Sequence, residues 1–141
     1  MFQNGKDGKK HRERFSPRKE ITKEAEETHG WTKESLIKSG YKKFSKGASE
    51  RLVNFLNDHP DLPIVAHKVK FDRDEVLKPA FKKVENDERM PKDERWRCTL
   101  TMAKAYGKIP VCFLDECLKH FKIDGRGDDL HDAVTDAKLA G

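Results

Sequence analysis

The chain lacks any long apolar segment. A helix that crosses a membrane needs about 20 consecutive apolar residues, and no such run occurs among the 141 residues. No positively charged and then apolar leader precedes a cleavage site after Met1. These two absences predict a cytoplasmic protein that does not enter a membrane.

Cysteine is also scarce, since only Cys98, Cys112 and Cys117 occur. An odd number without a paired framework is typical of a reducing compartment. Cys112, Cys117 and His120 could be interpreted as a metal cluster, but a fourth ligand is missing and the spacing matches no zinc pattern. Two thiols buried along a helix are the favoured interpretation.

Charged side chains, in contrast, are abundant. They make up 39% of the chain against 35% hydrophobic residues, and the formal net charge is +5. A net positive charge favours polyanionic partners, nucleic acid above all. The lysines and arginines are spread over several stretches, however, so a solvated basic surface explains them about as well as a binding groove.

The hydrophobic pattern alternates between helices and strands. After the turn dipeptides Asn4-Gly5 and Asp7-Gly8, residues 11–15 are expected to form a returning strand. Thr22 and Thr32 are placed to cap helices, and Pro79 is expected to kink a helix or begin a new one. Short strands separated by helices predict an α/β fold, a sheet with helices on its faces. The predicted helices cover residues 21–27, 45–59, 72–84, 99–106, 111–121 and a last one from 132, and the strands cover 62–67 and 95–98.

Two acidic residues lie at positions where α/β proteins commonly have their functional sites. Asp72 comes directly after the strand 62–67, at its carboxyl end. Asp136 lies in the first turns of the final helix, for which Asp132 is the expected N-cap, so that His131 stands just outside. The simpler alternatives are an acidic helix face and a carboxylate that is favoured by the helix dipole.

Three blocks of sequence give these residues a context. "THGWTKESL", "IVAHKVKFD" and "HDAVTDA" resemble, in order and spacing, the DnaQ-like 3′–5′ exonucleases of the DEDDh type. This family includes the proofreading subunit of bacterial DNA polymerase III. The resemblance implies an RNase H-like fold with a mixed sheet flanked by helices. It also implies removal of nucleoside monophosphates from single-stranded 3′ ends, DNA more than RNA, with a DNA polymerase as a possible partner.

The resemblance also implies roles for particular residues. Asp72 and Asp136 would be ligands of two divalent cations, Mg²⁺ or Mn²⁺, which activate water and stabilise the leaving oxygen. His131 would be the general base. Lys68 stands where the family usually has asparagine, and it would either contact a phosphate or compete with a metal for Asp72. The residues that would line the terminal nucleotide are His29, Gly30, Trp31 and Phe71, with Trp31 as a core aromatic being an open alternative.

One motif of the family is missing. No Asp-x-Glu occurs anywhere in the chain, although the family's first strand carries one. We therefore expect residues 1–141 to be a single exonuclease domain with an N-terminally truncated fold, short at its C-terminus, and weak or inactive alone. Two alternatives stay open: a non-catalytic basic remnant that binds nucleic acid or a partner, and self-association of two chains to complete the sheet.

Overall fold

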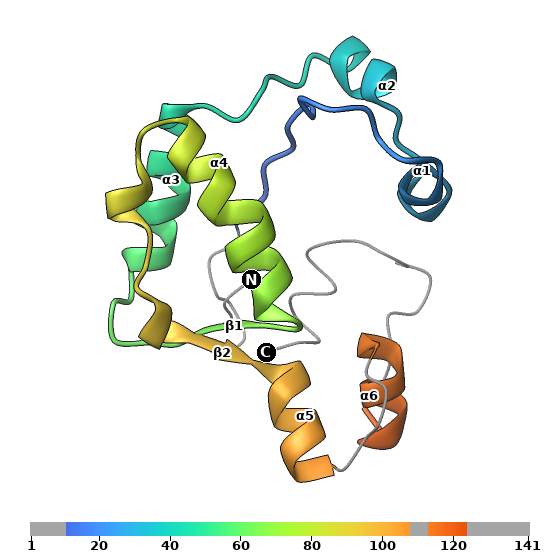
Figure 1. Ribbon diagram of the computed structural model, residues 1–141, viewed down its shortest axis with the longest axis vertical. Coiled ribbons are helices and arrows are strands. Elements are labelled where there is room, and N and C mark those ends of the chain that lie inside the picture. Colours follow the sequence, from blue (N-terminus) through green and yellow to red (C-terminus); the bar gives the residue numbers. More distant parts are fainter. Residues whose placement is uncertain (1–10, 108–112, 124–141) are drawn as a thin grey trace.

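The computed structural model describes residues 11–107 and 113–123. In these ranges the chain is mostly helical, with a small two-stranded parallel sheet (Figure 1). The elements are α1 (Lys23–His29), α2 (Lys33–Lys38), α3 (Lys46–Asn57), β1 (Ile64–Ala66), η2 (Lys70–Leu77), α4 (Lys78–Lys83), η3 (Asp87–Arg89), η4 (Asp93–Arg95), β2 (Trp96–Cys98), α5 (Thr99–Gly107) and α6 (Leu114–His120).

Hydroxyl side chains fix the starts of the first three helices. Thr22, Thr32 and Ser45 are the N-caps of α1, α2 and α3, and each accepts a hydrogen bond from the backbone N–H three residues later. Such a cap satisfies one of the free N–H groups of the first turn. Gly30 ends α1 with φ 73°, a left-handed conformation that glycine adopts without steric cost. Both predicted threonine caps are confirmed.

The helix that joins the two strands changes its winding at Pro79. The π-helix η2 leads directly into α4, whose first turn contains Pro79. Proline has no N–H and its ring clashes with the carbonyl of the preceding turn. The wider π winding just before it is one of the known responses to such a break in the ladder. The expectation that Pro79 begins a new first turn is confirmed.

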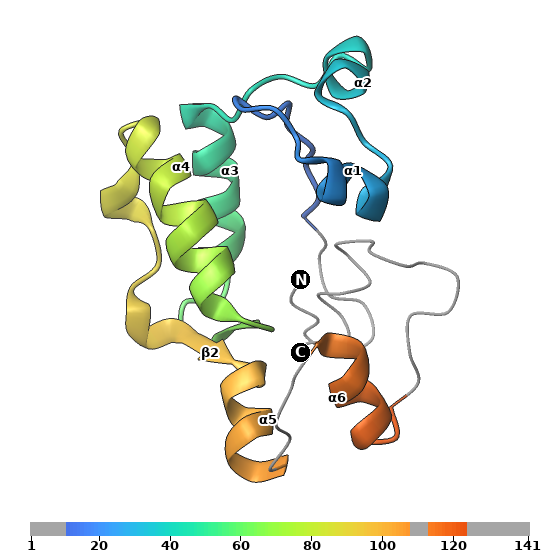
Figure 2. The ribbon, with the colours of Figure 1, turned by 45° about the vertical axis from the view of Figure 1, so that its right-hand side comes forward.

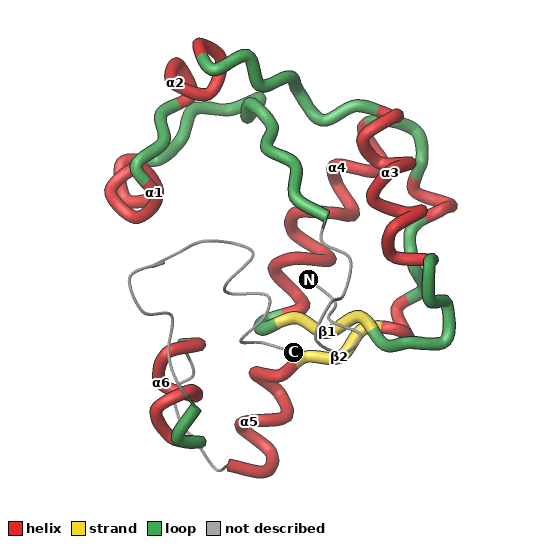
Figure 3. The backbone as a smooth tube through the Cα atoms, turned by 180° about the vertical axis from the view of Figure 1, so that it is seen from behind, coloured by secondary structure: helices red, strands yellow, loops and turns green. Residues whose placement is uncertain are grey.

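The sheet is the predicted pair of strands in shorter form. β1 and β2 run parallel, with Ile64 opposite Trp96 and Ala66 opposite Cys98. Figure 3 shows them side by side, with α3 and α4 above. A parallel pair needs a long crossover, here η2 and α4. The main core cluster contains Leu56, Ile64, Val69 and Trp96, which are all buried.

A second buried region joins α3 to α4. Val53 and Phe81 are each only 1% exposed. The ring of Phe44 packs on that of Phe81, with centroids 5.8 Å apart. Beside them, Asn86 Nδ2 donates to Ser49 Oγ at 2.8 Å, and both residues are buried. The two helices are therefore held together by apolar packing and by a satisfied polar pair.

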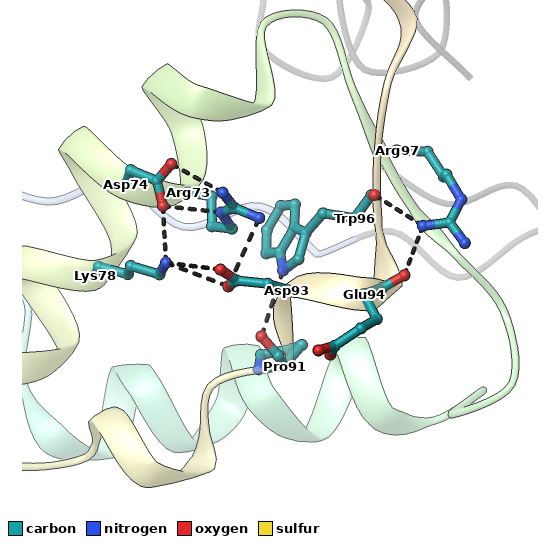
Figure 4. A network of polar contacts seen from close by, with 8 residues as sticks. All are labelled: Arg73, Asp74, Lys78, Pro91, Asp93, Glu94, Trp96 and Arg97. Atoms are coloured by element: carbon teal, nitrogen blue, oxygen red, sulfur yellow. Dashed lines mark hydrogen bonds and ion pairs between the residues drawn. The ribbon is translucent and has the colours of Figure 1, made fainter.

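A network of ion pairs holds η2 and α4 against η4 (Figure 4). Arg73 Nε lies 2.9 Å from Asp74 Oδ1, and Lys78 Nζ lies 2.9 Å from the same oxygen. Arg73 and Lys78 also reach Asp93 of η4, at 3.6 and 3.2 Å. Trp96 Nε1 donates to the carbonyl of Pro91 at 3.4 Å, which ties β2 to the same loop.

The prediction of a strand at residues 11–15 is wrong. The segment carries no strand, and its side chains bind α3 instead. Glu13 accepts two hydrogen bonds from Arg51, at 2.8 and 2.7 Å, and the ring of His11 lies 5.3 Å from that of Phe55. These side-chain contacts replace the expected strand ladder. The dipeptides at 4–5 and 7–8 and the helix expected from 132 lie outside the described residues.

The sheet is also smaller than expected. In the described ranges it is a parallel pair rather than the mixed sheet that the resemblance implies. Among the same residues, no helix combines the length and apolar character that a membrane crossing requires.

Candidate functional site at the carboxyl edge of the sheet

The two strands end at the same edge, because they are parallel and in register. β1 ends at Ala66, opposite Cys98 at the end of β2. The next residues are therefore neighbours: His67 Nδ1 lies 3.0 Å from the hydroxyl of Thr99, the first residue of α5. The carboxyl edge of parallel strands is where open α/β sheets bind ligands. Sequence reasoning assigned no functional role to His67, the last residue of the predicted strand 62–67, or to Thr99, which follows directly on the predicted strand 95–98.

The turn that leaves β1 is strained. Lys68 has φ 69°, a left-handed conformation that is uncommon for residues other than glycine. Phe71 N–H donates to the Lys68 carbonyl at 2.8 Å and closes the turn. This conformation places the Lys68 ammonium 5.8 Å from the centre of the Phe71 ring, within reach of a cation–π interaction. Phe71 is 48% exposed, so one aromatic surface and one positive charge are presented together.

Asp72 follows Phe71 in the first turn of η2 and is half-buried. Burial raises the pKa of its carboxyl, against the opposing effects of its own backbone N–H and of nearby His67 and Lys68. A carboxylate with a raised pKa at the edge of a sheet is a common feature of functional sites. The structure thus brings Lys68, Phe71 and Asp72 together.

Cys98 adds a group that the sequence did not identify as reactive. Partial burial alone would raise the pKa of its thiol. Hydrogen bonds from the hydroxyl and N–H of Thr101 and from the N–H groups of Val69 and Lys68 outweigh that effect, so that the pKa is lowered. The signal in the sequence was its position, at the end of a parallel strand and directly before a helix.

The other residues expected to line the nucleotide lie on a separate part of the chain. In Figures 1 and 2, α1 and α2 lie apart from the carboxyl edge of the sheet. His29 Nδ1 accepts from the N–H of Trp31 at 3.0 Å across Gly30. The half-buried Trp31 ring lies edge-on to Tyr41, with centroids 6.2 Å apart, and the Arg14 guanidinium sits 5.2 Å above it.

The remaining residues of the expected sites are outside the described ranges. These include His131 and Asp136, and also Cys112 of the zinc alternative. Within the described ranges, no group of three or more His, Cys, Asp or Glu side chains could hold a metal ion. Asp72, with Lys68 beside it, therefore does not form a two-ion site with the residues described.

Two of the three acidic residues of η2, Asp72 and Asp74, make a matched pair for a stability test. The pKa of Asp72 is raised above 3.8, so ionisation destabilises the fold as pH rises through that pKa. The pKa of Asp74 is instead lowered, by hydrogen bonds from Arg73 and Lys78, so its stabilising effect is lost on acidification.

We therefore expect opposite signs from the two asparagine substitutions at pH 7. Asp72→Asn should raise the urea midpoint of unfolding, and Asp74→Asn should lower it. The Asp72 difference should disappear below pH 3.8, whereas the Asp74 difference should shrink as pH falls below 3.8 and vanish only below the lowered pKa of Asp74 in the folded protein. Urea titrations at several pH values measure this directly. Equal signs at pH 7 would contradict the electrostatic environment described for Asp72.

No protein-family model fits the chain, and no curated protein is significantly similar to it.

Proposed function

We propose that the chain is an RNase H-like domain of the DEDDh exonuclease type, which engages single-stranded 3′ ends of nucleic acid and turns over slowly. The observation that carries the proposal is the position of Asp72, on a helix that leaves the carboxyl edge of a parallel strand pair. The family resemblance of the block "IVAHKVKFD" implies this position for the carboxylate of Asp72. The blocks that contain Trp31 and Asp136 stand before and after it in the expected order.

The side chains around Asp72 suit a nucleic-acid end. The exposed ring of Phe71 offers a stacking surface for a base of any identity. Lys68, above that ring, offers a positive charge for a phosphate. Neither contact reads sequence, which agrees with an enzyme that trims 3′ ends regardless of the terminal base.

Slow turnover follows from the shortage of carboxylates. Two-ion hydrolysis requires acidic ligands that neutralise and position both Mg²⁺ or Mn²⁺ ions. The chain has no Asp-x-Glu motif, which leaves Asp72 and Asp136 as the ligands that the resemblance assigns. Two carboxylates hold a pair of divalent cations poorly, and the neighbouring Lys68 weakens that hold further.

The test is digestion of a 5′-labelled single-stranded oligonucleotide with Mg²⁺ or Mn²⁺. We expect a ladder that shortens from the 3′ end, with turnover below about 10⁻² s⁻¹, roughly a thousandth of an ordinary kcat of about 10 s⁻¹. Asp72→Asn and Asp136→Asn should each abolish the ladder, while Asp74→Asn should leave it unchanged. Fast digestion, or digestion that survives both of the first two substitutions, would contradict the proposal.

A non-catalytic role is the second candidate. It is favoured by the absence, in the described ranges, of a metal-holding cluster, together with the net charge of +5. Such a protein would bind oligonucleotides in a salt-sensitive way and release no product at any metal concentration.

A further inference from the structure

One end of the helical layer gathers lysines from two distant segments. Figures 1 and 2 show that the start of α3 and the end of α4 lie at the same end of the molecule. The packing of Phe44 on Phe81 and the hydrogen bond from Asn86 to Ser49 fix this arrangement. Residues close to Phe44 and to Phe81 in sequence are therefore close in space.

Five exposed lysines flank these contacts, and we call them the lysine cluster. They are Lys42, Lys43, Lys46, Lys82 and Lys83. In the described part of the chain, none of their ammonium groups forms an ion pair or a hydrogen bond with another residue.

Several other basic side chains differ from the lysine cluster in this respect. Arg51 pairs with Glu13, and Arg73 and Lys78 pair with Asp74 and Asp93. Those charges are already compensated by carboxylates, whereas the lysine cluster keeps its charge available for an external anion.

A cavity of about 380 Å³ adjoins the lysine cluster through Lys82. Lys78, Lys92, Asp87 and Asp93 also line it. Asp93 is already engaged by Arg73 and Lys78, which leaves Asp87 as the other carboxylate of this lining. The cavity gives the cluster a concave side wall next to its exposed charges.

We propose that the lysine cluster binds the sugar–phosphate backbone of a single-stranded nucleic acid. Lysines make point-charge contacts to phosphates without reading bases. Lys82 stands ten residues after Asp72 on the continuous η2–α4 helix. At the α-helical rise of about 1.5 Å per residue the two are at most roughly 15 Å apart along the axis, because the wider π winding of η2 rises less. The lysine cluster would therefore bind the nucleic acid a few nucleotides upstream of its 3′ end. This polarity rests on the proposed function, which places the 3′ end at Asp72.

The test is fluorescence anisotropy of a labelled oligothymidylate in EDTA, over a series of KCl concentrations. The test variant carries Lys43→Gln, Lys82→Gln and Lys83→Gln. The matched control carries Lys19→Gln, Lys23→Gln and Lys38→Gln, which remove the same charge from exposed lysines of the α1–α2 region. All six side chains are exposed, so circular dichroism should show that both variants fold.

We expect the test variant to bind at least about tenfold more weakly at low salt. The slope of log K against log salt should fall by about 2, since each lost phosphate contact on a single strand removes about 0.7. The control should lose less than about threefold. Equal losses in the two variants, or wild-type binding that salt does not affect, would overturn the proposal.

The binding assay is independent of the nuclease assay because EDTA removes divalent cations. Cluster-dependent binding without any digestion would keep this inference and reject the exonuclease. Digestion that requires Asp72, together with binding that the lysine-cluster substitutions do not weaken, would keep the exonuclease and reject this inference.

Discussion

Replacing Phe81 by alanine is expected to lower the free energy of unfolding by about 3–5 kcal/mol. The Phe81 side chain is 1% exposed and lies where α4 packs on α3 and on the ring of Phe44. Truncation removes apolar surface from the core and leaves a cavity beside α3 that the surrounding structure fills only in part. Small domains are stable by only about 5–15 kcal/mol, so this change removes a large part of the total.

Urea denaturation followed by circular dichroism measures the effect. Phe81→Leu, which keeps most of the volume, should cost much less and should stay folded even where the alanine variant does not. Phe71→Ala is the control, because that ring is 48% exposed and should change the free energy of unfolding by less than about 1 kcal/mol. Equal losses at Phe81 and Phe71 would contradict the packing of α3 on α4.

Replacing Arg95 by alanine is expected to cost about 2–3 kcal/mol. Its guanidinium donates to the carbonyls of Leu56, His59 and Leu62 at 2.9, 3.1 and 3.1 Å, and to Asn57 Oδ1 at 2.7 Å. The end of a helix leaves carbonyls without internal partners, and a positive charge is favoured there. One side chain therefore closes α3 and fixes the loop that leads into β1. Hydrogen bonds to charged groups contribute about 1.5–3 kcal/mol each, and those of one side chain do not add fully.

Arg95→Lys should recover only part of the loss, because an ammonium cannot reproduce the planar fork of a guanidinium. Arg89→Ala is the matched control, since Arg89 is exposed and donates to α3 at Asn54 Oδ1 at 3.2 Å. We expect the control to lose less than about 0.5 kcal/mol. Comparable losses for Arg89→Ala and Arg95→Ala in urea titrations would show that the carbonyl cluster does not hold this loop.

Much of the local structure could be predicted because short-range chemistry dictates it. Thr22, Thr32 and Ser45 begin their helices by hydrogen bonds to the backbone three residues away. The strands Ile64–Ala66 and Trp96–Cys98 fall within the expected ranges 62–67 and 95–98, and each begins with a buried apolar side chain, Ile64 or Trp96.

Features that depend on distant contacts could not be predicted in the same way. The strand at residues 11–15 was expected from the turn dipeptides before it, whereas in the structure Glu13 of this segment pairs with Arg51 of the distant helix α3. The π winding before Pro79 also depends on surroundings, since a proline can break, kink or widen a helix.

The candidate site was predictable only in part. Asp72 stands where the sequence placed it, at the carboxyl edge of β1. The contact between His67 and Thr99 depends on the register of two strands about 30 residues apart, which no local pattern encodes. The lowered pKa of the Cys98 thiol similarly depends on N–H groups from the turn at Lys68 and Val69.

The most direct test of the 3′-end site is crosslinking with a photoactivatable nucleotide at one end of a single-stranded oligonucleotide. With the group at the 3′ end, in EDTA, the protein should crosslink within residues 67–72, and Phe71→Ala should reduce the yield. With the group at the 5′ end, crosslinks should fall elsewhere. Equal crosslinking of residues 67–72 by both ends, or none by the 3′ end of an oligonucleotide that binds, would contradict the assignment of this edge as a 3′-end site.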